Sequence, residues 1–204
     1  MAGSTKERIF EESLTLFSKN GYEASSVRDI AACLGMTQAA LYKHYKNKQA
    51  IYDSIIARMK ENERDRAAEY NMPAVTDSED AESYKALSVS QLKLYSTIQF
   101  VYWTEDSFAS RCRKMLTIEQ FHNYQASLLY QQYLVNGQFL YTQKLIAELQ
   151  RQGQWMEGDS WDMAVEFYGP ILAMILIYDG SENKEGIKTK LRTHISNVTK
   201  KYKK

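Results

Sequence analysis

The sequence contains few of the residues that stabilise small secreted proteins or interrupt helices. Its 204 residues include two cysteines, Cys33 and Cys112, and two prolines, Pro73 and Pro170. Two cysteines cannot build the disulfide framework of a small secreted domain, and no apolar signal segment follows Met1. No apolar run reaches the roughly 20 residues that a membrane-spanning helix needs. We therefore expect a cytoplasmic protein with reduced thiols.

Signals for β-strands are also missing. No alternating apolar and polar run is bounded by the turn dipeptides that mark hairpins. Apolar residues instead recur at helical spacing, and a hydrophobic content of 44% is ordinary for a globular protein. The sequence predicts an all-α fold with a small N-terminal helix-turn-helix domain and a larger C-terminal helical domain.

The most informative segment spans residues 25–48, which predicts two short helices joined by a glycine turn. Ser25 or Ser26 can cap the first helix, whose apolar face is formed by four residues: Val27, Ile30, Ala31 and Leu34. Gly35 permits the positive φ that a sharp turn needs, and Thr37 can cap a second helix beginning near Gln38. This arrangement is a helix-turn-helix, with the motif at about 27–46.

The second helix has a surface suited to a DNA groove. Leu41 and Tyr45 are spaced to pack inward, which leaves the polar positions outside. Gln38 can pair in bidentate fashion with adenine, and small alanines allow close approach to a thymine methyl group. The predicted DNA-binding residues are Ser26, Arg28, Thr37, Gln38, Ala39, Ala40, Tyr42, Lys43, His44 and Lys48. The alternative is an ordinary pair of surface helices, since such patterns also occur by chance.

With these motifs the chain resembles a TetR-type (TetR/AcrR) transcriptional regulator over its first sixty or so residues. The resemblance rests on Ile9, Phe10, Leu14 and Phe17 and on residues 20–22, 26–31, 34–36, 41–42, 45–48 and 51–52. Tyr45 stands where the family usually has Phe. Residues 37–40 differ from the family's common Ser-x-Gly-Thr, which leaves the operator sequence open. The resemblance implies an all-helical homodimer whose N-terminal domains bind a palindromic DNA operator and whose C-terminal domains bind a small-molecule effector.

Three regions follow from this interpretation. Residues 1–47 are the expected DNA-binding domain, 48–70 a connecting helix, and 71–204 the effector-binding and dimerisation domain. Within the last region we expect an acidic linker at 76–81 and helices at 82–103, 106–115 and 118–152, the last one broken near 136–137.

Two late segments predict self-association. Residues 167–178 are almost wholly apolar, and a later helix carries an apolar stripe at spacings of four, four and three. The predicted dimer interface consists of Phe167, Ile171, Met174, Ile187, Leu191, Ile195 and Val198. Because the stripe has no obvious use in a monomer, we expect a stable dimer. The alternative is that both segments are ordinary core helices.

Aromatic and methionine side chains in the C-terminal region suggest an apolar effector pocket with hydroxyl donors. The candidate pocket residues are Tyr102, Trp103, Met115, Phe121, Tyr124 and Phe167, although most aromatic residues at such spacing simply fill a core. Glu119 and His122 are three residues apart and could meet near such a cavity, where a buried carboxylate or imidazole could recognise a cation or a polar head group. We expect them instead to form a surface pair.

Neither catalysis nor a cofactor is indicated. The three histidines fall in three different predicted helices, and no metal-ligand spacing or glycine-rich phosphate loop occurs. We expect Cys33 to be a small core residue, and Cys112 to have a lowered thiol pKa only if it is exposed. The lysines of 200–204 are expected to solvate a frayed terminus rather than to bind nucleic acid.

The resulting prediction is a repressor released from operator DNA by a small molecule. The alternative is a constitutive DNA-binding or architectural dimer controlled by a protein partner.

Overall fold

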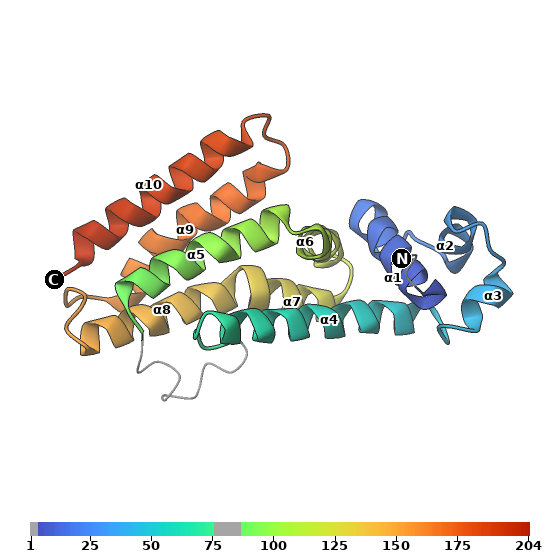
Figure 1. Ribbon diagram of the computed structural model, residues 1–204, viewed down its shortest axis with the longest axis horizontal. Coiled ribbons are helices and arrows are strands. Elements are labelled where there is room, and N and C mark those ends of the chain that lie inside the picture. Colours follow the sequence, from blue (N-terminus) through green and yellow to red (C-terminus); the bar gives the residue numbers. More distant parts are fainter. Residues whose placement is uncertain (1–3, 76–86) are drawn as a thin grey trace. The chain divides into compact units, whose positions relative to one another are not determined.

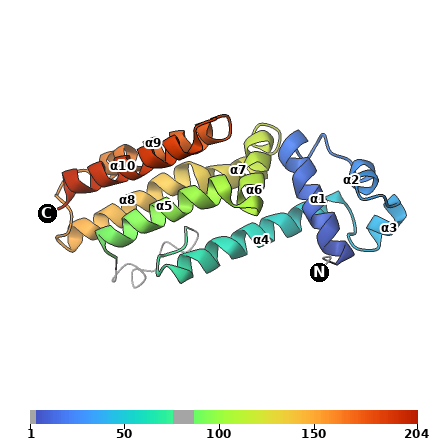
Figure 2. The same cartoon turned by 45° about the horizontal axis from the view of Figure 1, so that its top comes forward.

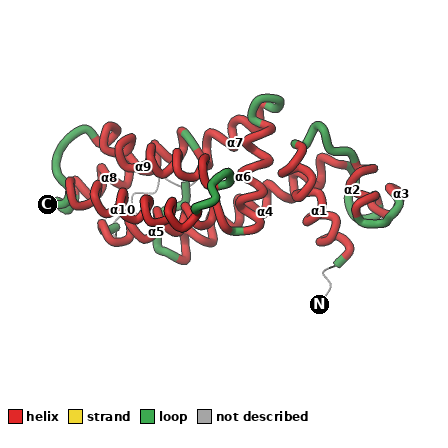
Figure 3. The backbone as a smooth tube through the Cα atoms, turned by 90° about the horizontal axis from the view of Figure 1, so that it is seen from above, coloured by secondary structure: helices red, strands yellow, loops and turns green. Residues whose placement is uncertain are grey.

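The computed structural model describes residues 4–75 and 87–204. The described residues form helices and no strand (Figures 1 and 3), which confirms the predicted all-α fold. The helices are α1 (Thr5–Asn20), α2 (Val27–Cys33), α3 (Gln38–Tyr42), α4 (Lys48–Glu69), α5 (Val89–Glu105), α6 (Ser107–Glu119), α7 (Tyr124–Leu134), α8 (Asn136–Arg151), α9 (Ser160–Tyr178) and α10 (Lys184–Tyr202).

The chain forms two compact units that interleave along the sequence. The first unit consists of Met1–Glu63 and Ser107–Tyr130, and the second consists of Arg64–Asp106 and Gln131–Lys204. The division into 1–47, 48–70 and 71–204 was a division by function, and it stays a prediction. The compact units cut across it because α6, from the middle of the chain, packs against α1.

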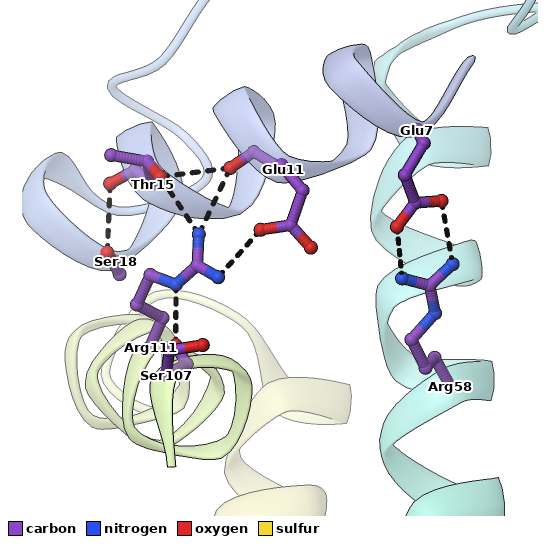
Figure 4. Close-up of polar contacts among 7 residues, drawn as sticks. All are labelled: Glu7, Glu11, Thr15, Ser18, Arg58, Ser107 and Arg111. Carbon is purple, nitrogen blue, oxygen red and sulfur yellow. Dashed lines mark hydrogen bonds and ion pairs between the residues drawn. The ribbon is translucent and has the colours of Figure 1, made fainter. Parts of the chain in front are cut away.

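Helices α1 and α6 pack side by side in the first unit (Figure 2). The rings of Phe10 on α1 and Phe108 on α6 stack with their centroids 6.0 Å apart. At the edge of this contact the Arg111 guanidinium donates to the Glu11 carboxylate at 2.7 Å and to the Thr15 hydroxyl at 3.0 Å (Figure 4). Apolar burial thus joins the two helices, and polar contacts fix their register.

The same unit contains the predicted helix-turn-helix. Ser26 and Asp29 form a reciprocal capping box at the start of α2, with the Asp29 amide donating to Ser26 Oγ at 3.1 Å and the Ser26 amide donating to Asp29 Oδ2 at 3.0 Å. Gly35 turns the chain with φ +63°, and Thr37 Oγ1 accepts from the Ala40 amide to cap α3. Leu41 is fully buried. The local predictions for this motif are confirmed.

The second unit consists mainly of α5, α8, α9 and α10. Helix α9 packs against all three of the others, and α10 lies along α9 and α5. The predicted helix from residue 82 begins later in the described part, because Ser88 Oγ accepts from the Gln91 amide and caps a helix starting at Val89. The predicted linker at 76–81 lies outside the described residues.

The predicted break near 136–137 is present but shifted by one residue. Val135 separates α7 from α8, and the preceding carbonyl, that of Leu134, accepts a hydrogen bond from Tyr168 at 2.8 Å. A Cβ at position 137 would lie 2.0 Å from the Gln132 carbonyl oxygen, so only glycine fits there. Helix α6 also runs on to Glu119, four residues beyond the predicted end at Met115.

The apolar stripe of α10 is already buried within one chain. Its members are each at most 6% exposed: Ile187, Leu191, Ile195 and Val198. The inference that this stripe has no use in a monomer is therefore wrong, because α9 and α5 cover it. Their role in a dimer interface stays a prediction.

The predicted frayed C-terminus is also wrong. The backbones of Lys203 and Trp155 form an isolated antiparallel β-bridge, and the Met156 amide donates to the Tyr202 carbonyl at 2.7 Å. The buried Trp155 ring stacks on Tyr202 at 5.9 Å. Stacking and backbone hydrogen bonds hold the end of α10 in place.

Helix α9, with 19 residues, is long and apolar enough to span a membrane by length and composition alone. One such helix is weak evidence, since a core helix of a soluble protein has the same composition. Here one side of α9 faces the core while Leu176 and Ile177 are exposed.

The glycine turn before α3 provides a first test. Gly35 has positive φ and nothing within 4 Å of the position of a Cβ, so substitution there costs only backbone strain. We expect Gly35→Ala to lower the free energy of unfolding by about 1–2 kcal/mol, and Gly35→Asn to cost less because asparagine visits this region more readily. Urea unfolding of both variants measures the difference. An alanine variant as stable as the parent would contradict the strained turn.

Candidate DNA interface and effector cavity

The predicted DNA-binding residues lie on the first turn of α2, on α3 and on the segment after it. Most are exposed: Ser26, Arg28, Thr37, Gln38, Ala39, Tyr42, Lys43 and His44. Ala40 and Lys48 are half-buried. The inward residues Leu41 and Tyr45 pack below them. The motif therefore presents an amide, small side chains and cations on one short helical segment.

The positive charges of this segment are available to a ligand. Lys43 and Lys46 are exposed, and no ion pair involves either of them among the residues described. A cation without an internal carboxylate partner can neutralise a DNA phosphate without first breaking a salt bridge. This arrangement favours phosphate contacts flanking the recognition helix.

Two predicted contact residues have structural partners instead. The Lys48 ammonium donates to the carbonyls of Tyr22 at 2.8 Å and Ser25 at 3.0 Å, and it lies 4.0 Å from the centre of the Tyr22 ring. The Ser26 hydroxyl donates to Asp29 at 2.6 Å, and this bond helps to lower the pKa of the Asp29 carboxyl. Phosphate contacts from Lys48 and Ser26 stay predictions, because each side chain also holds the loop or the cap together.

Glu119 is a residue whose place the sequence did not reveal. Its side chain is 2% exposed, and its Oε1 accepts from the Tyr22 amide at 2.6 Å and from the Glu23 amide at 3.4 Å. The expected surface pair of Glu119 with His122 is therefore wrong. The carboxylate joins the end of α6 to the loop between α1 and α2, which are nearly one hundred residues apart in sequence.

The two cysteines also differ from expectation. Cys33 is exposed rather than part of the core, and desolvation followed by the charge of Glu12 raises the pKa of its thiol. Cys112 is fully buried, which rules out the exposed, acidic thiol considered for it. Neither position has the features of a reactive cysteine.

The second unit contains a cavity among α5, α8 and α9. About 30 Å³ of it is open to a water-sized molecule, which is room for one or two waters. Aromatic and aliphatic side chains and four uncharged polar ones other than tyrosine form the walls. The lining residues are Leu92, Tyr95, Ser96, Gln99, Phe100, Trp103, Gln138, Tyr141, Thr142, Leu145, Tyr168, Ile171 and Ile175.

Only Trp103 of the six candidate pocket residues lines this cavity. Phe121 and Tyr124 are 80% and 74% exposed, and Met115 lies in the core of the first unit. The Tyr102 ring instead lies 3.3 Å from the Arg66 guanidinium, and Phe167 packs beside His194. Aromatic content alone did not separate core, surface and cavity. Ile171, expected in the dimer interface, is a cavity residue.

The cavity's polar residues were the signal that the sequence did offer. Gln99 donates to the Tyr95 hydroxyl at 2.5 Å and accepts from Arg66 Nη2 at 3.1 Å, so its amide is held at both ends. Gln138 and Thr142 are one helical turn apart on α8 and also line the cavity. Glutamines inside otherwise apolar helix faces mark this site better than its aromatics do.

The N-terminal segment of the chain is similar to known proteins. Residues 9–55 match the family described as bacterial regulatory proteins, tetR family. Over 47 residues the chain is 40% identical to IcaR of Staphylococcus epidermidis, the HTH-type negative transcriptional regulator of the biofilm operon icaADBC. That alignment covers 23% of this chain and 25% of IcaR, so the chain spans about a quarter of the curated relatives it matches.

Solved structures resemble the fold over nearly the whole chain. The SmeT–triclosan complex has a TM-score of 0.67 at 18% identity and covers 99% of this chain and 93% of its own. SmeT is the repressor of the Stenotrophomonas maltophilia multidrug efflux pump SmeDEF. A putative transcriptional regulator from Saccharomonospora viridis in complex with choline has a TM-score of 0.65 at 16% identity, covering 98% and 97%. At this identity the likeness shows the fold, with its N-terminal helix-turn-helix and larger helical domain.

The contact between Glu119 and the loop gives a second test. We expect Glu119→Ala to lower the free energy of unfolding by about 1–3 kcal/mol, because it removes the buried acceptor of the Tyr22 amide. Glu119→Gln keeps a carbonyl oxygen at that place and serves as the matched control with a smaller loss. Chemical denaturation of the three proteins measures this order. Equal losses in both variants would show that the acceptor oxygen does not matter.

Proposed function

From the match of residues 9–55 to the tetR family of bacterial regulatory proteins, we propose that this chain is a homodimeric transcriptional repressor that binds palindromic operator DNA in the cytoplasm. In this proposal a small-molecule effector releases it from DNA, and it has no catalytic role. The negative regulator IcaR supports repression as the direction of control.

The exposed face of α3 is the observation that carries the proposal. Gln38 and Ala39 occupy the first turn of the recognition helix, where base edges are contacted when such a helix enters the major groove. Lys43 and Lys46 follow at the helix end and supply phosphate contacts. The short helix is held by Thr37 and Leu41, so these groups are presented by a rigid element.

The exposed apolar side of α9 supports a dimer with a second copy of this chain. Leu176 and Ile177 are 50% and 58% exposed, and Val165, Pro170 and Ala173 are exposed on the preceding turns. Apolar side chains in contact with water favour a partner. A two-fold dimer places two recognition helices on one DNA face, at half-sites about 34–36 Å apart or a multiple of that distance.

The cavity of the second unit supports release by a small molecule over control by a protein partner. It lies among three helices and is lined by apolar and uncharged polar side chains, as in ligand sites generally. SmeT has been solved with triclosan, and the Saccharomonospora regulator with choline. We propose that effector binding moves α4, which changes the separation of the recognition helices.

The base-reading role of Gln38 is the direct test of this function. With a preferred operator selected from random duplex DNA, we expect Gln38→Ala to cost about 1–3 kcal/mol per half-site. On operators mutated at the base pair that Gln38 reads, the cost should be small. Fluorescence anisotropy titrations give both values. Equal losses on the two kinds of DNA would contradict base reading by Gln38.

Lys43→Ala is the matched control for this titration. We expect it to weaken binding to all sequences alike and to reduce the slope of affinity against salt by about one unit per site. Failure to select any preferred duplex from the random pool would overturn the proposed function itself.

The dimer is tested at α9 rather than at the buried stripe. We expect the double substitution Leu176→Glu, Ile177→Glu to produce a monomer of unchanged helical content, because it places charge in a desolvated interface. Leu94→Glu, at a 54% exposed leucine of α5, is the control that stays dimeric. Leu191→Glu should instead unfold the protein, because Leu191 is 1% exposed within one chain. Sedimentation of the parent protein as a monomer at micromolar concentration would contradict the dimer.

A further inference from the structure

Two polar side chains face the cavity without using their hydrogen-bonding groups. Gln138 and Thr142 of α8 are 7% and 4% exposed, and both line the cavity. Within 4–75 and 87–204, neither the Gln138 amide nor the Thr142 hydroxyl hydrogen-bonds another side chain or the backbone. Because both residues are more than nine-tenths buried, a partner for these groups has to come from within the cavity.

The fold positions this pair rigidly. Gly137, which no other residue can replace without a clash, immediately precedes Gln138 at the start of α8. Thr142 follows four residues later, so both side chains project from the same face of the helix. The other wall offers a comparison, because Gln99 there has both ends of its amide engaged by Tyr95 and Arg66. Of the two glutamines that line the cavity, the Gln99 amide therefore has hydrogen-bond partners within the described part of the protein and the Gln138 amide does not.

The charge of the cavity restricts what can bind. None of the lining residues is charged. The Arg66 guanidinium is bound to Gln99 and is not itself a lining residue. A charged ligand would therefore lose its hydration without gaining a counter-charge, which is unfavourable in a buried site. A neutral ligand with a donor and an acceptor side by side would pair with both the carbonyl oxygen and the amino group of the Gln138 amide.

We propose that Gln138 and Thr142 select the effector, and that the effector is an uncharged, compact, largely apolar molecule bearing a carboxamide or a similar adjacent donor and acceptor. The Gln138 amide donates to the ligand carbonyl and accepts from the ligand N–H, and the Thr142 hydroxyl binds the same polar group. The apolar body packs among side chains such as Trp103 and Ile175. The assignment rests on the proposed function only in naming this ligand an effector. Because little of the cavity is open, the lining side chains must move apart when the ligand binds.

Four probes of similar size test the class of ligand. They are benzamide, benzoate, benzylamine and toluene, each added at millimolar concentration to the free protein, with the thermal midpoint as the readout. We expect benzamide to raise the midpoint most, since a ligand of the folded state stabilises it in proportion to its affinity. A larger shift with benzoate or benzylamine, or no shift with benzamide, would overturn the proposal.

Variants of the two glutamines separate a binding role from a structural one. We expect Gln138→Leu to leave the free protein equally or more stable, because it removes a buried amide that has no internal partner. It should weaken benzamide binding by about tenfold or more and strengthen toluene binding. Thr142→Val should weaken benzamide binding less. A Gln138→Leu protein that unfolds more easily than the parent would show that the amide serves the fold, and the proposal would fail.

Gln99→Leu is the matched control. It should destabilise the free protein, because it leaves Arg66 and Tyr95 without their shared partner. The outcome is also separable from the proposed function. Benzamide binding that leaves operator affinity unchanged would refute effector release and retain the ligand class. An anionic compound that binds the cavity and releases DNA would refute the ligand class and retain effector release.

Discussion

The loop between α1 and α2 is held by opposite charges acting on opposite backbone groups. The Lys48 ammonium, at the start of α4, donates to the carbonyls of Tyr22 and Ser25. From α6, the Glu119 carboxylate accepts from the amide of Tyr22. Charge-assisted hydrogen bonds are stronger than neutral ones and fix geometry more narrowly. The position of α2 and α3 relative to α1 depends on this loop, and therefore on both side chains.

This constraint explains why α6 belongs to the first unit although it lies in the middle of the sequence. Its apolar face packs on α1, with Phe108 against Phe10, and its last residue reaches the loop. A displacement of α6 would remove the buried Glu119 acceptor from the amides of Tyr22 and Glu23 as well as apolar contact, so the helix has one strongly preferred position. Arg111, bound to Glu11 and Thr15 on α1, opposes sliding along the helix axis.

Local structure could be predicted from the sequence because its causes are local. The cap by Ser26, the turn at Gly35 and the cap by Thr37 each depend on residues within four positions, and all three are present. The all-α class and the bounds of α4 follow in the same way from spacing and from the lack of strand signals.

The predictions that failed concern which surface a helix face meets. Spacing shows that Leu191 and its neighbours form an apolar face but not whether the same chain or another covers it, and α9 and α5 do so. The same ambiguity placed Cys33 in the core and Phe121 in a pocket, although both are exposed. Glu119 was missed because its partners are backbone amides nearly one hundred residues away, which no side-chain pattern encodes.

Helix α9 links the two roles proposed for the second unit. One side of it supplies Tyr168, Ile171 and Ile175 to the cavity, and the other leaves Leu176 and Ile177 exposed. The Tyr168 hydroxyl also donates to the Leu134 carbonyl at the break before α8, where Gln138 begins the polar wall. If a ligand shifts these cavity side chains, the outward face of the same helix must respond, since packed helices transmit displacement rather than absorb it. By linkage, a ligand that alters subunit association must in turn be bound with different affinity by monomer and dimer. The cavity and the proposed interface are therefore not independent, because one helix forms a wall of each.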